Sequence, residues 1–231
     1  MKRREAVLSG AKTAVPIVLG YLPVGVAYGL LAVQSRLTPL EALSMSMFVF
    51  AGSSQLISVD MLAAGAGWIQ IVLMTLMVNL RHILMSAALS LQFRKTPSKW
   101  LPFLGFLITD EAFAVGSATI AQEKHKGAFF AGLGVTGYLG WLLASCLGIL
   151  LGSVLPPGGI PGLDFVLPSM FIVLLVMQIK AKLEVVVAVI AGALSLLFVS
   201  LLPNNWNVIV ATIIAATVGA VMERWRNPDA Q

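Results

Sequence analysis

Long apolar stretches recur along this chain of 231 residues, and they constrain its fold more than any other feature. Each stretch has the length, about 17–25 residues, that an α-helix needs to cross the hydrocarbon core of a bilayer. Lipid offers the backbone no hydrogen-bond partners, so a spanning segment must be a helix or part of a closed barrel. The alternation of polar and apolar residues that barrel strands require is absent. The sequence therefore predicts an all-α polytopic integral membrane protein.

Composition agrees with this fold class and leaves no room for a sizeable soluble domain. Hydrophobic residues make up 58% of the chain and charged residues only 11%, with a mean hydropathy of +0.94, whereas soluble domains carry about 25% charged residues. We expect one membrane-embedded domain over residues 1–231. It contains eight apolar segments, at residues 12–34, 41–59, 66–91, 100–121, 128–150, 163–179, 183–202 and 206–222.

The same residues argue against several classes of function. The net charge of +5 is spread thinly over short loops, where it sets membrane orientation and does not indicate nucleic-acid binding. One cysteine and two histidines predict neither a metal site nor another cofactor, and no glycine-rich phosphate loop is present to bind ATP. Ser53 or Ser54 with His82 has the residue types of a serine protease, but the flanking glycine of a nucleophile turn is missing. We therefore expect a protein that is not an enzyme.

Basic residues in the loops predict that both termini lie in the cytoplasm, because cytoplasmic loops are rich in Lys and Arg. If all eight segments cross, the cytoplasmic side holds ten loop cations and the other side four. The ten are Lys2, Arg3, Arg4, Lys12, Lys124, Lys126, Lys180, Lys182, Arg224 and Arg226, and the four are Arg36, Arg94, Lys95 and Lys99. If instead segments 12–34 and 100–121 re-enter, each folding back as two half-helices, all fourteen face the cytoplasm. Helix breakers such as Pro23 and Gly105 would permit this, and both alternatives stay open.

Four ionisable residues lie at membrane depth, Arg81 and His82 in one segment and Asp110 and Glu111 in another. A charge there costs about 2.5–3.5 kcal/mol on insertion scales, so such residues persist where they face partners, water or a substrate. Adjacent acids in a low dielectric do not both ionise easily, and one of them could carry a proton during transport. A carboxylate could also bind the amino group of a substrate. The competing interpretation is structural, with one acid only neutralising Arg81.

A polar stripe runs along the helix expected at 66–91 and consists of Thr75, Asn79, His82 and Ser86. Arg81 points about 160° away from Asn79. It therefore needs its own partner, for which the two acids are the obvious candidates. An unperturbed histidine titrates near neutral pH, so His82 could relay protons; the alternative is a hydrogen-bonded structural histidine.

Small polar residues cluster around a glycine in segment 41–59, in the run Gly52-Ser53-Ser54-Gln55. Such a run can unwind and offer backbone groups to a ligand, as the broken helices of transporters do. The alternative is a close contact between helices, joined by Ser and Gln hydrogen bonds. The amide of Gln55 needs several partners away from water, which favours a place on a substrate path.

Segment 128–150 carries a small residue at every fourth position, which is typical of a ridge that lets two helices pack backbone to backbone. The ridge consists of Ala128, Gly132, Thr136, Gly140, Ala144, Gly148 and Gly152. The last segment repeats the pattern at Ala211, Ala215 and Gly219. We interpret both as packing faces, and a subunit contact is an alternative for them.

Four motifs stand out along the chain: Gly20-Tyr21-Leu22-Pro23-Val24-Gly25, Phe50-Ala51-Gly52-Ser53-Ser54-Gln55, Asn79-Leu80-Arg81-His82 and Thr109-Asp110-Glu111-Ala112-Phe113. In this order and spacing they resemble the AzlC family, the large subunit of bacterial branched-chain amino acid exporters. The C-terminal third carries no motif that can be matched.

The resemblance implies a two-component exporter in the bacterial cytoplasmic (inner) membrane, driven by the proton motive force. Its partner would be a small hydrophobic subunit of the AzlD type, and its substrates valine, leucine, isoleucine and often methionine. The site residues rest on the physical interpretation instead. The predicted translocation path consists of Gly52, Ser53, Ser54, Gln55, Asn79, Arg81, Asp110, Glu111 and Phe113. Proton coupling is assigned to Asp110, Glu111 and His82, and helix breaking or packing to Pro23, Gly132, Gly140 and Gly148.

A zwitterionic substrate with an apolar side chain needs three kinds of partner. Arg81, Ser hydroxyls or half-helix N-termini could hold its carboxylate, and the two acids its ammonium. Side chains such as Met47 and Phe113 could line the aliphatic part. Two other functions stay open: a passive channel for a small solute, and a structural subunit whose buried charges only lock helices together.

Overall fold

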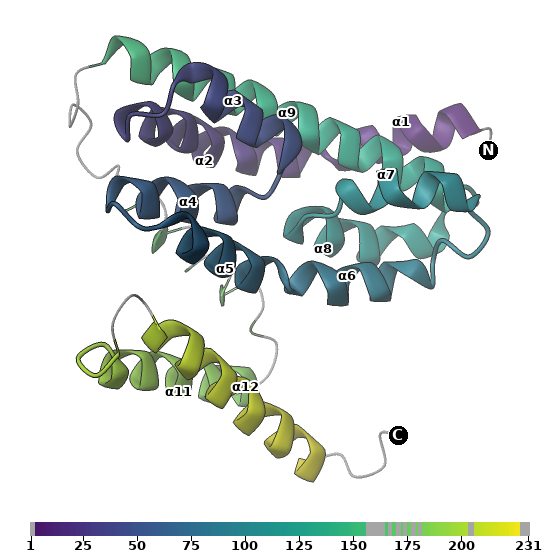
Figure 1. The fold of residues 1–231 in the computed structure, drawn as a ribbon. Helices are drawn as coiled ribbons and strands as arrows, with labels where there is room; N and C mark the ends of the chain where they lie inside the picture. The colour runs from purple at the N-terminus through teal and green to yellow at the C-terminus, as the bar shows by residue number, and fades with distance from the viewer. Residues whose placement is uncertain are drawn as a thin grey trace. The chain divides into compact units, whose positions relative to one another are not determined.

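The computed structural model describes residues 3–155, 182–202 and 206–226, with isolated positions between 165 and 179. Contacts divide the chain into two compact units, Met1–Leu167 and Pro168–Gln231. The first unit contains α1 (Arg3–Thr13), α2 (Val15–Gln34), α3 (Pro39–Phe48), α4 (Gly52–Ala63), α5 (Trp68–Asn79), α6 (Arg81–Ser90), the 3₁₀ turn η1 (Ser98–Trp100), α7 (Leu101–Phe106), α8 (Asp110–Thr119), the 3₁₀ turn η2 (Ile120–Gln122) and α9 (Lys126–Val154) (Figure 1). The second contains α11 (Lys182–Phe198) and α12 (Trp206–Arg226). The predicted all-α class is confirmed for the described residues.

Three helices among the described residues are long and apolar enough to span a membrane, namely Val15–Gln34, Trp68–Ser90 and Lys126–Val154. Each corresponds to one of the predicted segments. A shorter apolar helix, Val210–Glu223, corresponds to the last one. The segment predicted at 163–179 lies largely outside the described residues, so the number of eight segments stays a prediction.

The first span continues α1 almost without interruption. The N–H of Ala14 donates to the carbonyl of Gly10, and the carbonyl of Ala14 accepts from Val18, both at 3.0 Å. Pro23 lies inside α2 and does not end it; a proline removes one hydrogen bond, and the packing of α2 along α9 outweighs that loss. Re-entry, the alternative for segment 12–34, is therefore wrong, and so is the interpretation of Pro23 as a helix break.

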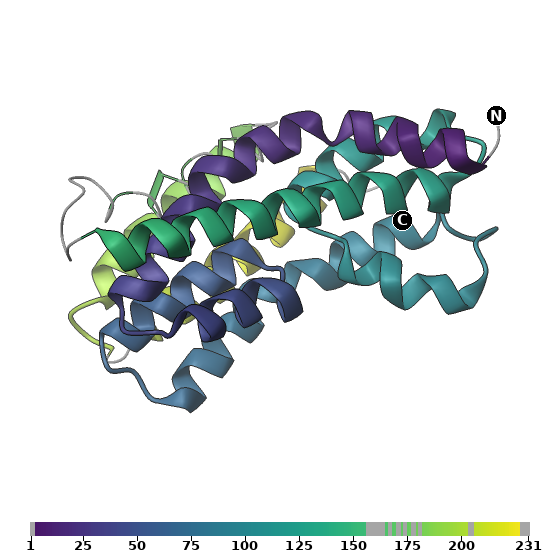
Figure 2. The ribbon, with the colours of Figure 1, turned by 90° about the horizontal axis from the view of Figure 1, so that it is seen from above.

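The small-residue ridge of α9 lies against α1 and α2, which run in the same direction as α9 (Figures 1 and 2). A Cβ added at Gly132 would lie 2.1 Å from the carbonyl oxygen of Val7, and one at Gly148 the same distance from that of Val26. Only glycine permits backbones to approach this closely. The ridge therefore makes a contact within the chain.

Two pairs of short helices fold back instead of crossing. In Figure 1, α3 and α4 form one such hairpin at the end of the unit away from the N-terminus, and α7 and α8 form the other at the N-terminal end. The chain segments that flank the second hairpin meet: Lys126 Nζ donates to Gln92 Oε1 at 2.5 Å. Segment 100–121 thus folds back as two half-helices, which is the shape that the re-entrant alternative predicts.

Segment 41–59, predicted as an ordinary span, is the unexpected hairpin. The chain breaks between α3 and α4, where Phe50 has φ +45°. A right-handed helix cannot continue through that backbone conformation. The sequence carries no proline there, but the polar run Gly52-Ser53-Ser54-Gln55, which can unwind, follows the break directly. What the sequence does not predict is that the chain reverses there.

In the second unit, α11 and α12 pack against each other. Ala211 and Ala215 are buried, and a Cβ on Gly219 would lie 2.8 Å from Val187 Cγ2. Asn207 Nδ2 donates to the carbonyl and the hydroxyl oxygen of Ser195, both at 3.2 Å. The second small-residue pattern therefore also faces a helix of the same chain.

Candidate functional site

Three helix interruptions bring the polar motifs together inside the first unit. The breaks lie at residues 49–51, at Leu80 and at residues 107–109, so that α4, α6 and α8 begin at Gly52, Arg81 and Asp110. Thr109 caps α8, because its hydroxyl accepts the N–H of Ala112 at 3.2 Å. Each motif thus occupies the start of a half-helix.

Arg81 joins the three half-helix starts. Its Nη2 donates to Ser53 Oγ at 2.5 Å and forms an ion pair with Asp110 Oδ2 at 2.8 Å. Both charged side chains are largely covered, with 27% and 22% of their surface exposed. The partner of Arg81 is therefore Asp110, one of the two acids expected. Nε of Arg81 is buried and has no hydrogen-bond partner among the described residues.

The start of α4 adds to the positive potential near Arg81. Ala51 provides no side-chain cap, and a helix N-terminus carries about half a positive charge on its unpaired N–H groups. Ser53 is 5% exposed. Gly52 lies against the indole of Trp141, where an added Cβ would come within 2.6 Å of Cη2. This terminus therefore offers backbone donors in a covered position.

A chain of hydroxyls leads from α2 to Glu111. Tyr21 Oη donates to Glu111 Oε2 at 2.9 Å and lies 2.7 Å from Thr109 Oγ1. A tyrosine has one hydroxyl hydrogen, so Thr109 donates to Tyr21 when Tyr21 donates to the carboxylate. The arrangement is a short route along which a proton can pass to or from Glu111.

Ser54 and Gln55 extend the polar network away from the charges. Ser54 Oγ donates to Asn79 Oδ1 at 2.7 Å. Gln55 is fully buried; its Nε2 donates to Ser46 Oγ at 3.0 Å, and its Oε1 accepts from Trp141 Nε1 at 3.2 Å. The amide therefore has the several partners it was expected to need, in a network that also locks α4 onto α3 and α9.

Aromatic side chains from several helices line this network. The aromatic cluster consists of Tyr21, Tyr28, Phe50, Phe106, Tyr138 and Trp141. Ring centroids lie 5.0 Å apart for Phe50 and Tyr138 and 5.4 Å apart for Tyr21 and Trp141, in edge-to-face pairs. The cluster places an apolar surface next to the charged groups, because Tyr21 and Trp141 belong to both.

Three side chains predicted for the site have other surroundings. His82 Nδ1 donates to the carbonyl of Asn79 at 3.2 Å, at the helix break, as a structural histidine does. Phe113 is half-buried within α8, one turn beyond Asp110. The side chain of Met47 is 42% exposed, and its carbonyl accepts from Tyr138 Oη at 2.9 Å.

The sequence analysis assigned no functional role to Thr109, to Tyr21 or to the other members of the aromatic cluster. A tyrosine in an apolar segment is a usable signal, because its hydroxyl seeks a hydrogen-bond partner when buried. The described residues contain no group of three or more His, Cys, Asp or Glu side chains that could hold a metal ion.

Comparison with known proteins places the chain in a family. The model of the AzlC protein family matches residues 16–155, which include the whole site. An uncharacterized membrane protein of Helicobacter pylori is 33% identical over 78% of this chain and 82% of its own. The inner membrane protein YgaZ of Escherichia coli is 31% identical over 81% of this chain and 80% of its own. The branched-chain amino acid transport protein AzlC of Bacillus subtilis is 27% identical over 97% of this chain and 89% of its own. No solved structure matches. The chain belongs to the AzlC family.

Proposed function

We propose that this protein is the large subunit of a two-component, proton-coupled exporter of branched-chain amino acids in the bacterial inner membrane. Its substrates would be valine, leucine, isoleucine and also methionine. The names of two relatives support the proposal, one a branched-chain amino acid transport protein and the other an inner membrane protein. The observation that carries it is the convergence of Arg81, two acids and an uncapped helix start beside an aromatic cluster.

The groups of the site match those of a branched-chain amino acid. The N–H groups at the start of α4 and the unpartnered Nε of Arg81 would receive the carboxylate. Asp110 and Glu111 would hold the ammonium. The aromatic cluster would contact the aliphatic side chain, whose burial contributes about 1.5–3 kcal/mol.

Proton coupling is assigned to Glu111 in preference to Asp110. Asp110 is engaged in an ion pair with Arg81 at 2.8 Å. Glu111 has no ion pair among the described residues and bonds to Tyr21 instead. It is therefore the acid free to take up and release a proton during the cycle, and Tyr21 and Thr109 would conduct that proton.

The positive-inside rule orients the first unit with the N-terminal end in the cytoplasm. The loops and helix ends there carry Arg3, Arg4, Arg94, Lys95, Lys124 and Lys126. Arg36 follows the far end of α2 and would face outward, so the arrangement with all fourteen cations inside is not the one proposed. A small hydrophobic subunit of the AzlD type completes the proposal.

The test measures export against a gradient. Cells lacking the gene and cells expressing it with the partner are fed a branched-chain dipeptide, and intracellular valine and leucine are followed. We expect lower internal levels with the pair, and loss of the difference on adding a protonophore. Equal levels with both proteins in the membrane would refute branched-chain export. Export that only equalises the concentrations would favour the passive channel.

A matched pair of variants tests the coupling residue. Glu111→Gln should abolish the pH dependence of export between pH 6 and 8 while the protein stays in the membrane. Asp60→Asn removes an exposed acid from α4, outside the site, and should export normally. Unchanged pH-dependent export by Glu111→Gln would refute the role of Glu111 without touching the substrate assignment.

A further inference from the structure

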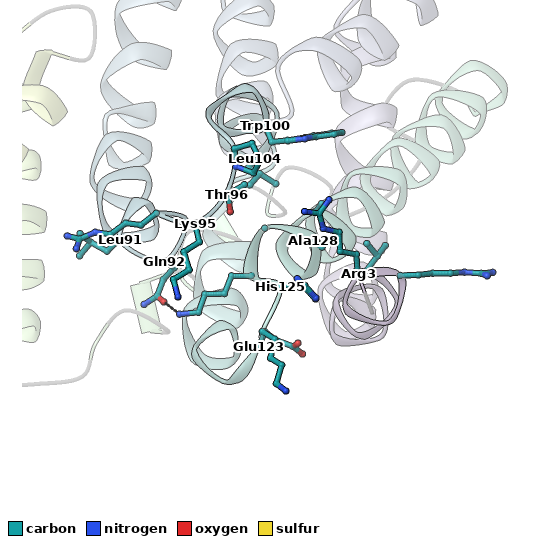
Figure 3. A pocket seen from close by; sticks show the side chains of 18 residues that line it. Arg3, Leu91, Gln92, Lys95, Thr96, Trp100, Leu104, Glu123, His125 and Ala128 are labelled. Atoms are coloured by element: carbon teal, nitrogen blue, oxygen red, sulfur yellow. Dashed lines mark hydrogen bonds between the residues drawn. The ribbon is translucent and has the colours of Figure 1, made fainter. Parts of the chain in front are cut away.

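A cavity of about 970 Å³ lies at the N-terminal end of the first unit, apart from the candidate site. Its walls come from α1, from the loop that follows α6, from α7 and from the turn before α9 (Figure 3). The lining thus comes from three stretches of the chain, residues 3–7, 91–104 and 123–131. The hydrogen bond from Lys126 to Gln92 holds two of them together.

The cavity carries a strong excess of positive charge. Its lining cations are Arg3, Arg4, Arg94, Lys95, Lys124 and Lys126. Among the described residues, Glu123 is the one acid that lines it. Its Oε1 accepts from Ser9 at 3.0 Å, and its Oε2 is buried with no hydrogen-bond partner in that part of the chain. A single carboxylate cannot balance six cations, so the cavity attracts an anion.

The other lining residues indicate what kind of anion it is. Val7, Leu91, Trp100 and Leu104 add apolar surface beside the cations. The orientation proposed above puts this end of the unit at the cytoplasmic headgroups. α9 has 29 residues and is about 44 Å long, whereas the hydrocarbon core is about 30 Å thick, so α9 is long enough for its first turn to extend past the acyl chains. Trp100, 51% exposed, is of the type enriched at that interface.

We propose that this cavity binds the headgroup of an anionic glycerophospholipid. The cations bind the phosphodiester, and the apolar wall covers the glycerol and the first acyl carbons. Basic pockets between membrane helices bind lipid headgroups in this way. Free inorganic phosphate would use the cations but not the apolar wall, which is why the lipid is favoured.

The experiment titrates the purified full-length protein in detergent with short-chain phosphatidylglycerol or phosphatidylcholine, and counts bound lipids by native mass spectrometry. The pocket variant is Lys95→Gln with Lys124→Gln, two exposed residues whose neutralisation leaves the packing intact. The control, Arg36→Gln with Lys182→Gln, removes the same charge from residues outside the cavity. A third arm adds inorganic phosphate equimolar with the lipid.

We expect tighter binding of phosphatidylglycerol than of phosphatidylcholine by the wild type and the control. The pocket variant should bind phosphatidylglycerol about thirtyfold more weakly, with phosphatidylcholine unchanged. Arg94→Gln alone should weaken it about fivefold, which keeps the test open if the double variant aggregates. Equal binding of the two lipids by the wild type, or an equal loss in the control, would overturn the proposal. Displacement by equimolar inorganic phosphate would make this a free-phosphate site and would overturn it as well.

Discussion

Replacing glycines of α9 one at a time by alanine should produce a graded loss of stability set by the space each methyl group meets. At Gly137 an added Cβ lies 3.7 Å from its nearest neighbour, an ordinary contact. At Gly140 it lies 2.9 and 3.0 Å from the two methyls of Val18, a β-branched side chain that can yield only slightly. At Gly148 it lies 2.1 Å from the carbonyl oxygen of Val26, which cannot shift without its helix.

The distances give the magnitudes. A carbon rests no closer than about 3.3 Å to a carbonyl oxygen, so Gly148→Ala forces α9 and α2 apart by roughly 1.2 Å. Overpacking of this kind costs about 1–3 kcal/mol, occasionally more, while alanine returns about 1 kcal/mol of helix propensity. The expected net loss is about 2 kcal/mol for Gly148→Ala. It is about 1 kcal/mol for Gly140→Ala, where a clash with a side chain costs less than one with the backbone, and Gly137→Ala should gain up to about 1 kcal/mol.

Thermal unfolding of the purified protein in detergent, followed by tryptophan fluorescence, measures the series. A chain of this size loses about 2–4 °C in Tm per kcal/mol, so Gly148→Ala should unfold about 4–8 °C below the wild type. Gly20→Ala on α2 is the control, since its Cβ meets nothing within 4 Å. Equal Tm values for the Gly148 and Gly137 variants would show that α2 and α9 do not touch as described.

Three further changes test the polar site. Arg81→Gln leaves the largely covered carboxylate of Asp110 without a cation and should lower the free energy of unfolding by about 3 kcal/mol. Adding Asp110→Asn should recover part of the stability but not export. Full recovery of export by the double variant would favour the structural subunit. Tyr21→Phe removes two hydrogen bonds, so it should lower the free energy of unfolding by about 1–2 kcal/mol and lower the rate of export over the pH range tested. Export at the wild-type rate at every pH would exclude the hydroxyl route. Gln55→Leu leaves the indole N–H of Trp141 and the Ser46 hydroxyl short of a partner and should cost about 2 kcal/mol or more in thermal unfolding; a Tm equal to wild type would mean that the network adds no stability.

Local patterns in the sequence were enough to predict much of this protein. The apolar segments predicted helices in a membrane because the bilayer leaves the backbone few choices. Charges at membrane depth marked Arg81 and Asp110, since an unpaired charge there is too costly to persist. The spacing of small residues indicated the packing ridge of α9. Each of these features depends on residues close together in the chain.

Other features depend on contacts between distant residues. The break at Phe50 turns an apparent span into a hairpin. The polar run after Phe50 permits local unwinding, but contacts between helices decide that the chain reverses there. The pairing of Arg81 with Asp110, and of Tyr21 with Glu111, exists only because two hairpins and a span bring their ends together.

The sequence by itself therefore determined the class of fold, the residues too costly to bury without partners and the family. The tertiary structure alone decided which segments are continuous helices and which fold back, which partner each charge has and where the aromatic cluster lies. The physical reason is how far apart in the chain the interacting residues lie. Helix formation and membrane insertion depend on neighbours in the chain, whereas the folding back of hairpins and ion pairing depend on packing between distant helices.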